Sequence, residues 1–494
     1  MKKKILYALL FSFALSSCLK DNGNYEYGDL ADVNISGIDE SLRCLLQEPQ
    51  SITPNIETTI PESNLEYCWR IGADTLSKTR DFNYTFSKVP VSNKPLIFEV
   101  RDKTTNIRYS KSVKLQVVSP FTTGWAVLTD NNGVPELSFQ SLEGEKPLYS
   151  NIYKEVNGDA LTGTPVSVKQ LVYTDGFTGQ RMDRLSILMK GGKSPELDGI
   201  SLLRMKYYDD EFHTDEIPQM AYISAQCYYT DLSLSIITTD GVVYGKYVGS
   251  MGTPDDGYYQ YPFGEDALGY KLAPMHSSVI QQGIYVGFDE KNHRFVQWSP
   301  GTLSSKVLPI SFNEAGSVSG VNLNSFPGTA LWLGNTYYNS DGNMYAVLKN
   351  NGKYYLYAYN FGYSYDVYDF IYKLTGFAEL PDGTVNDNSV FVVSPSTPYI
   401  YVGTGNKLKA INLSSLNDIN SAVNDLATYD GDITGLLYSQ DNNYLKNAEF
   451  VVAVSNGNNS TINVVDPTLT ARGQILKSYP GIKGRIVSIC RKIM

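Results

Sequence analysis

Asn343-Met-Tyr-Ala-Val-Leu-Lys-Asn-Asn-Gly-Lys-Tyr-Tyr-Leu-Tyr-Ala-Tyr359 is the stretch that decides the fold of this chain. Apolar and aromatic residues fill both arms, and the Asn351-Gly352 pair between them is the pair that tight β-hairpins favour. Related strand–turn–strand segments recur beyond residue 120, at residues 124–139, 184–203, 232–244, 283–298, 399–411 and 450–465. The chain beyond residue 120 is therefore expected to be an array of antiparallel hairpins.

The spacing of these segments predicts the architecture. Successive copies start roughly 50 to 60 residues apart, which suits the four-stranded blades of a β-propeller. Seven blades fit residues 120–494 better than six or eight, at about 53 residues each. The segment from Gly484 to Cys490 resembles the strand that precedes the hairpin in other copies, whereas the first copy has no such strand. We expect this last strand to pair beside residues 124–129 and to close the ring, removing an open sheet edge.

Residues 31–119 have a different sequence pattern, in which short runs of alternating apolar and polar residues are separated by turns. The runs expected to be strands are 33–35, 42–45, 65–71, 82–86, 96–101 and 112–118. Several short strands with a tryptophan, Trp69, in a middle one predict an immunoglobulin-like β-sandwich. The chain is therefore expected to be all-β, with a sandwich followed by a propeller.

The chain begins with an export segment. Lys2, Lys3 and Lys4 precede an apolar run over residues 5–15, and small residues lead to Cys18. The apolar run is shorter than the roughly 20 residues that a membrane-spanning helix needs. Residues 1–17 are expected to be a signal peptide, and residues 18–30, polar and rich in Asn and Gly, a flexible tether.

Two resemblances extend this interpretation. Leu15-Ser-Ser-Cys18 resembles the lipobox of bacterial lipoproteins, which implies that Cys18 is acylated and becomes the mature N-terminus. Tyr67-Cys-Trp-Arg-Ile71, Phe98-Glu-Val-Arg-Asp102 and Val113-Lys-Leu-Gln-Val117 resemble polycystic-kidney-disease (PKD) type domains. Together with the opening Cys18-Leu-Lys-Asp-Asn-Gly-Asn-Tyr-Glu-Tyr-Gly-Asp29, they make the chain similar to the PKD-like family of lipoproteins. The resemblance implies lipid anchoring in the outer membrane, facing outward.

Charge and cysteine content exclude other classes. The net charge of −10 argues against nucleic acid as a partner, because phosphate binding needs clustered Lys and Arg. Five cysteines in a chain of this length do not make a disulfide scaffold. Cys44 and Cys68 fall in the same small domain, where they could pair or remain buried thiols.

No catalytic, metal or cofactor motif is complete. Gly191-Gly-Lys-Ser194 resembles the end of a P-loop, but Ile187 stands where the motif needs glycine, so we expect a turn. His213, His276 and His293 lie in separate repeats without paired ligand spacing. We therefore expect no metal, no cofactor and no catalytic residue.

The most suggestive surface stretch is the aromatic loop 253–264. We expect Tyr258, Tyr259, Tyr261 and Phe263 to form a stacking platform for a sugar or peptide, because loops often carry binding residues. Tyr337, Tyr338, Tyr363, Tyr365 and Tyr368 could extend the same rim. The alternative is that these rings only pack loops onto the propeller.

Three functions remain open. The first is a non-enzymatic surface lipoprotein that serves a starch-utilisation-type, TonB-dependent importer and its substrate-binding lipoprotein as an accessory subunit. The resemblance implies this role, with an oligosaccharide or a peptide as ligand. The second is a hydrolase or lyase, since propellers host both. The third is a structural cap that docks on the importer.

Overall fold

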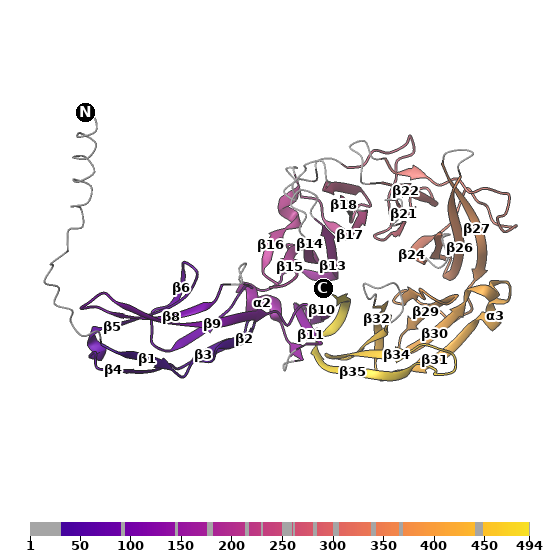
Figure 1. The fold of residues 1–494 in the computed structure, drawn as a ribbon. Coiled ribbons are helices and arrows are strands. Elements are labelled where there is room, and N and C mark those ends of the chain that lie inside the picture. The colour runs from indigo at the N-terminus through magenta and orange to yellow at the C-terminus, as the bar shows by residue number, and fades with distance from the viewer. Residues whose placement is uncertain are drawn as a thin grey trace, which may run out of the picture. The chain divides into compact units, whose positions relative to one another are not determined.

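The computed structural model describes residues 31–89, 94–143, 147–174, 181–212, 217–228, 231–248, 259, 262–279, 284–299, 306–336, 342–364, 369–439 and 448–493 (Figure 1). The chain divides into two compact units. The first comprises residues up to 44, 49–85 and 92–116, and the second comprises 45–48, 86–91 and 117–494. Among the described residues, no helix is long and apolar enough to cross a membrane.

The first unit is a set of antiparallel strands in three sheets. Its strands are β1 (Val33–Ser36), β2 (Ser41–Leu45), β3 (Pro49–Ile52), β4 (Asn55–Thr58), β5 (Leu65–Ile71), β6 (Asp74–Ser77), β7 (Phe82–Thr85), β8 (Leu96–Asp102) and β9 (Arg108–Val118), with the short helix η1 (Glu62–Asn64). The largest sheet has the order β2-β9-β8-β5-β6, and the pairs β1-β4 and β3-β7 form the other two. All six strands expected in this region are present. The strands β3, β4 and β6 were not predicted because each has four residues and little apolar alternation.

Aromatic rings fill the core of this unit. Trp69 on β5 lies with its ring centroid 4.5 Å from that of Phe98 and 4.9 Å from that of Phe82. All three side chains are buried, and the Trp69 Nε1 donates a hydrogen bond of 3.0 Å to the Arg80 carbonyl. Burying large aromatic rings provides much of the hydrophobic stabilisation in a small β domain. This stabilisation offsets the conformational entropy that the chain loses on folding. The tryptophan-bearing strand β5 therefore lies inside the sheet, between β8 and the edge strand β6, and its ring lies in the core.

The second unit contains seven sheets among its described residues, and in Figure 1 they follow one another around a common centre. The first has the order β12-β11-β10-β36, with β10 (Gly124–Asn131), β11 (Val134–Ser141), β12 (Leu148–Tyr149) and β36 (Arg485–Lys492). The next two are β13 (Thr164–Thr174), β14 (Arg181–Lys190), β15 (Pro195–Asp198) and β16 (Arg204–Tyr207), then β17 (Met220–Tyr228), β18 (Asp231–Thr238) and β19 (Val243–Val248).

The other four sheets continue in chain order. They are β20 (Ser277–Val279), β21 (Ile284–Asp289), β22 (Arg294–Trp298) and β23 (Leu308–Pro309); β24 (Thr329–Thr336), β25 (Gly342–Asn350), β26 (Lys353–Ser364) and β27 (Asp369–Glu379); β28 (Val390–Val393), β29 (Tyr399–Thr404), β30 (Lys407–Asn412) and β31 (Val423–Thr428); and β32 (Asp432–Tyr438), β33 (Phe450–Asn456), β34 (Asn459–Asp466) and β35 (Gln474–Lys483). Short helices are α2 (Ile152–Asn157), η2 (Tyr208–Glu211), η4 (Leu413–Asp418) and α3 (Ile419–Ala422).

The β25–β26 hairpin forms as its sequence predicts. Its turn residues Asn351 and Gly352 both have positive φ, 49° and 78°, the geometry whose twist matches that of the flanking strands. The hairpin segments predicted for the other copies also form, with one exception. The partner of β14 is β15, at Pro195–Asp198, and not the predicted segment 199–203, which forms the turn before β16. The Gly191-Gly192 turn reverses the chain at once, so the next strand starts earlier than the apolar pattern suggested.

The C-terminal strand pairs where it was predicted to pair. β36 runs antiparallel to β10, with Gly124 opposite Lys492 and Thr129 opposite Ile486. It occupies the position in its sheet that β32 occupies in the sheet β32-β33-β34-β35, which confirms the likeness between the two segments. It also contacts β13 and β32, the first strands of two other sheets. The two ends of the second unit are thus joined in one sheet.

Cys44 and Cys68 are free thiols, so the alternative in which they form a disulfide is wrong. Cys44 is fully buried, and burial raises the pKa of its thiol to about 11. Cys44, on β2, points into the core, whereas Cys68, on β5, points to the outer face of the sheet. The Cys68 Sγ lies 3.8 Å from the Thr75 hydroxyl. Alternation along the strands places the two sulfur atoms on different faces, which separates them.

Candidate binding groove

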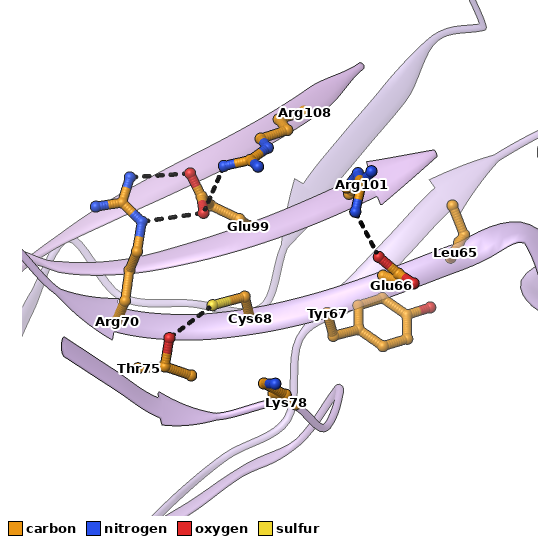
Figure 2. Close-up of a pocket in the computed structure, with 10 residues that line it drawn as sticks. All are labelled: Leu65, Glu66, Tyr67, Cys68, Arg70, Thr75, Lys78, Glu99, Arg101 and Arg108. Carbon is orange, nitrogen blue, oxygen red and sulfur yellow. Dashed lines mark hydrogen bonds and ion pairs between the residues drawn. The ribbon is translucent and has the colours of Figure 1, made fainter. Parts of the chain in front are cut away.

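The described part of the first unit contains a groove on the outer face of its five-stranded sheet (Figure 2). Its volume is about 550 Å³. Polar and charged side chains from neighbouring strands supply most of the lining: Leu65, Glu66, Tyr67, Cys68, Arg70, Thr75, Lys78, Glu99, Arg101 and Arg108. A groove of this size can accommodate a few residues of a polymer or a small polar ligand.

The sequence places these charges outward by strict alternation. On β8, Leu96, Phe98 and Val100 are buried, while Glu99 and Arg101 point to the opposite face. On β5 the same alternation sends Glu66, Cys68 and Arg70 outward, and the register sets Cys68 opposite Glu99 and Glu66 opposite Arg101. Side chains on neighbouring strands that share a face are close enough to pair. The core pattern of the sandwich therefore also generates the charged face.

Glu99 lies at the centre of this face, between two arginines (Figure 2). Arg70 donates from Nε and Nη2 to the two carboxylate oxygens of Glu99, over 3.0 Å and 2.9 Å. These two hydrogen bonds from Arg70 lower the pKa of the Glu99 carboxyl. On the other side, the Arg108 Nη1 lies 4.0 Å from the Glu99 Oε2. Glu99 thus stays ionised near neutral pH and is poorly suited to act as a general acid.

Arg101 is held by weaker contacts at the other end of the groove. Its Nε donates to Asn106 Oδ1 over 2.6 Å, and its Nη1 donates to Glu66 Oε2 over 3.1 Å. Both side chains of the Arg101–Glu66 ion pair are about half exposed. Exposed pairs of this kind contribute little to stability, so a charged ligand can displace them at low cost.

The charges of the groove do not balance. Arg70, Lys78, Arg101 and Arg108 face Glu66 and Glu99, which leaves an excess of two positive charges. The surrounding segment 31–119 contains eleven Lys and Arg and eleven Asp and Glu, and the whole chain has a net charge of −10. The positive excess is therefore a local property of this face, and it suits an anionic ligand.

A comparison with known protein families identifies the first part of the chain. Residues 18–165 match the PKD-like family. This confirms the resemblance that the sequence suggested. The match begins at Cys18, covers the first unit and extends through β10, β11, β12 and α2 to the start of β13.

No curated protein matches the chain. Among solved structures, the chain is similar to a quinoprotein alcohol dehydrogenase-like protein from Bacteroides thetaiotaomicron, at 13% identity and a TM-score of 0.48, over 92% of this chain and 96% of that one. It is also similar to the WD40 domain of Toxoplasma gondii coronin, at 11% identity and a TM-score of 0.41, over 71% of this chain and 85% of that one. The family match and the seven successive sheets in the described residues of the second unit together make the chain all-β, with a PKD-like part followed by a propeller-like part.

The predicted aromatic platform does not appear at the residues that the structure describes. Tyr258 and Tyr261 lie outside the described residues. Tyr259 is fully buried and stacks on Phe212 with ring centroids 5.0 Å apart, so its expected exposure is wrong. Phe263 is half-buried against the cluster that includes Trp298 and donates its N–H to the Val243 carbonyl. Both rings pack the loop onto the unit, as in the alternative interpretation.

The other predicted residues of this rim and of the tether fall outside the description. Tyr337, Tyr338, Tyr365 and Tyr368 are not among the described residues, and neither is Cys18. Tyr363 lies in β26, and its side chain is not described. A binding role for this rim and the acylation of Cys18 remain predictions.

The histidines do not converge in the part of the chain that the structure describes. His276 is buried among aromatic rings, 4.3 Å from the Tyr285 centroid, and its burial, followed by the charge of Lys169, lowers its pKa well below 6.5. His293 is a turn residue with a positive φ of 52°. His213 lies outside the described residues, which contain no group of three or more His, Cys, Asp or Glu that could hold a metal ion. Gly191 and Gly192 form the predicted turn.

The second unit contains a buried ionic network that the sequence did not reveal. Lys206 Nζ lies 2.8 Å from Glu211 Oε1 and 3.8 Å from Glu196 Oε1. Lys246 reaches Glu211 over 2.6 Å, and the Tyr208 hydroxyl donates to Glu196 over 2.7 Å. Both glutamates are almost completely buried. Charged residues scattered over β15, β16, η2 and β19 gave no sequence signal, because only the packing of separate strands brings them together.

Proposed function

We propose that this protein is a non-enzymatic, lipid-anchored surface protein of a bacterial outer membrane, and that it binds an oligosaccharide or peptide. We further propose that it is an accessory subunit of a TonB-dependent importer of the starch-utilisation type. The observation that carries the proposal is the position of Cys18. This cysteine closes an export segment, and the PKD-like family match starts at the same residue. A family pattern that begins at a lipobox-type cysteine supports acylation at that position.

The proposed body of the protein is a closed seven-bladed propeller. The seven sheets found in the described part of the second unit and the pairing of β36 with β10 support it. A ring in which the last strand completes the first sheet leaves no unpaired inner edge and holds its loops in fixed positions. Such a body is a rigid support for binding loops.

The charged groove supports a binding role for the PKD-like unit. Most of its side chains come from the strands β5, β8 and β9, with Thr75 from β6 and Lys78 directly after it, and its arginine and glutamate groups can recognise polar ligands. A hydrolase would need accessible acids that converge on a substrate. Glu196 and Glu211, which share Lys206, are buried, so this pair does not supply such acids, and Glu99 in the groove is held by Arg70.

Lipid labelling in the native host tests the proposal. Cells fed a clickable fatty acid should label the wild-type protein, whereas Cys18→Ala should take up no label and leave the outer membrane. Purification of the labelled protein from solubilised outer membranes should recover an importer and its substrate-binding lipoprotein. An unlabelled wild-type chain would refute the anchoring, and a labelled chain purified without an importer would refute the accessory role.

A further inference from the structure

We propose that the groove on the outer face of the five-stranded sheet in the first unit binds an oligosaccharide bearing carboxylate groups. This inference deepens the proposed binding role by naming the ligand class and the residues that select it. It rests on that role, but its test does not depend on acylation.

Two cations of the groove are available to a ligand. Arg108 has a side chain that is 62% exposed, and its ion-pair contact is the 4.0 Å approach to Glu99, whose two oxygens already accept from Arg70. Lys78 is exposed at the other side of the groove, and it forms no ion pair within the described part of the chain (Figure 2). A guanidinium can bind a carboxylate through two parallel hydrogen bonds, and the lysine ammonium adds a second point of attraction.

The remaining groups of the groove suit a ligand rich in hydroxyl groups. Glu66, an exposed carboxylate that pairs weakly with Arg101, can accept hydrogen bonds from sugar hydroxyls, and the Thr75 hydroxyl can donate or accept them. An oligosaccharide with carboxylates carries both kinds of group along one chain. Its carboxylates would lie against Arg108 and Lys78, and its hydroxyls against the acids and Thr75.

The placement of the groove on a sheet face disfavours a peptide. β8 pairs with β5 on one side and β9 on the other, whereas β6 pairs with β5 only at Trp69, Arg70 and Ile71. The backbone N–H and C=O groups of β8, the strand that carries Glu99 and Arg101, are therefore used within the sheet and cannot bind the main chain of an added strand. Above this strand, recognition depends on side chains, and these are mainly ionic and polar.

Binding of a defined probe to the full chain tests the proposal. Calorimetry should detect binding of hexagalacturonate, weakening with added salt, and much weaker binding of the neutral hexasaccharide maltohexaose. Lys78→Glu with Arg108→Glu should weaken the binding of hexagalacturonate at least about tenfold, because two charge-assisted contacts become repulsive. Lys114→Glu is the matched control, since Lys114 is an exposed cation on β9 outside the groove lining. It should leave the affinity within about twofold.

Several results would overturn the proposal. These are the absence of hexagalacturonate binding, equal binding of maltohexaose or hexaglutamate, and an unchanged affinity in the Lys78/Arg108 variant. All three substituted side chains, Lys78, Arg108 and Lys114, are exposed, so matching thermal melts should establish that the variants fold. Failure here with Cys18 labelled would leave the anchoring proposal intact, and binding without labelling would leave the groove intact.

Discussion

The packing of the C-terminal strand β36 against the second sheet should depend on one buried ion pair, Lys492–Asp183. On β36, the Lys492 side chain is fully buried, and its Nζ lies 2.5 Å from Asp183 Oδ2 on β14. The other Asp183 oxygen accepts a 3.0 Å hydrogen bond from the Gln170 amide. The pair thus links the last strand of the chain to the second sheet of the second unit. We predict that Lys492→Met destabilises this unit.

The expected size follows from burial. Lys492→Met conserves most of the side-chain volume but leaves the Asp183 carboxylate, which is 7% exposed, without its cation. Removing one partner of a buried pair costs about 3–5 kcal/mol, because the remaining charge is desolvated and uncompensated. Asp183→Asn combined with Lys492→Met removes both charges and should recover part of the loss.

Thermal and urea unfolding of the full chain measure the effect. The matched control is Arg485→Ala on β36, which removes a 3.0 Å ion pair to Asp432 on β32 whose two side chains are both about half exposed. It should cost less than about 1 kcal/mol. A Lys492→Met variant as stable as Arg485→Ala, or a double variant less stable than Lys492→Met, would refute the reasoning.

Three further predictions concern the C-terminus and two titrating groups. Deleting residues 484–494 should lower the melting temperature of the second unit sharply, since β10 loses its partner, and an unchanged melt would contradict the joined ends. His276 stays neutral in the folded chain while unfolded histidine protonates, so stability should fall as the pH drops below about 6.5, and His276→Phe should flatten that fall in pH-dependent melts. The Glu99 carboxyl has a lowered pKa, so its fork with Arg70 stabilises the fold above the ordinary carboxyl pKa of about 4.3 and is lost at lower pH. Glu99→Gln should therefore be less stable than wild type at neutral pH, with the difference in melting temperature shrinking below about pH 4.

The sequence by itself determined the features that depend on neighbouring residues. The Asn351-Gly352 turn and its apolar arms specify the β25–β26 hairpin, because turn geometry and strand alternation are local properties. Alternation also placed Trp69 in the core of the first unit. The partner of the last strand was predictable as well, since the pattern of residues 484–490 supplied the one strand that the first copy lacked.

Only the tertiary structure decided which distant side chains meet. Arg70 and Glu99 are 29 positions apart, and Lys492 and Asp183 are 309 apart. Such pairs depend on strand register and on the packing of one sheet against another, and composition or periodicity carries no record of either. The burial of Tyr259 has the same cause: an aromatic loop residue looks alike in sequence whether it faces solvent or a neighbouring ring such as Phe212. Local alternation and turn chemistry fixed the strands, and long-range packing decided where their charges and rings lie.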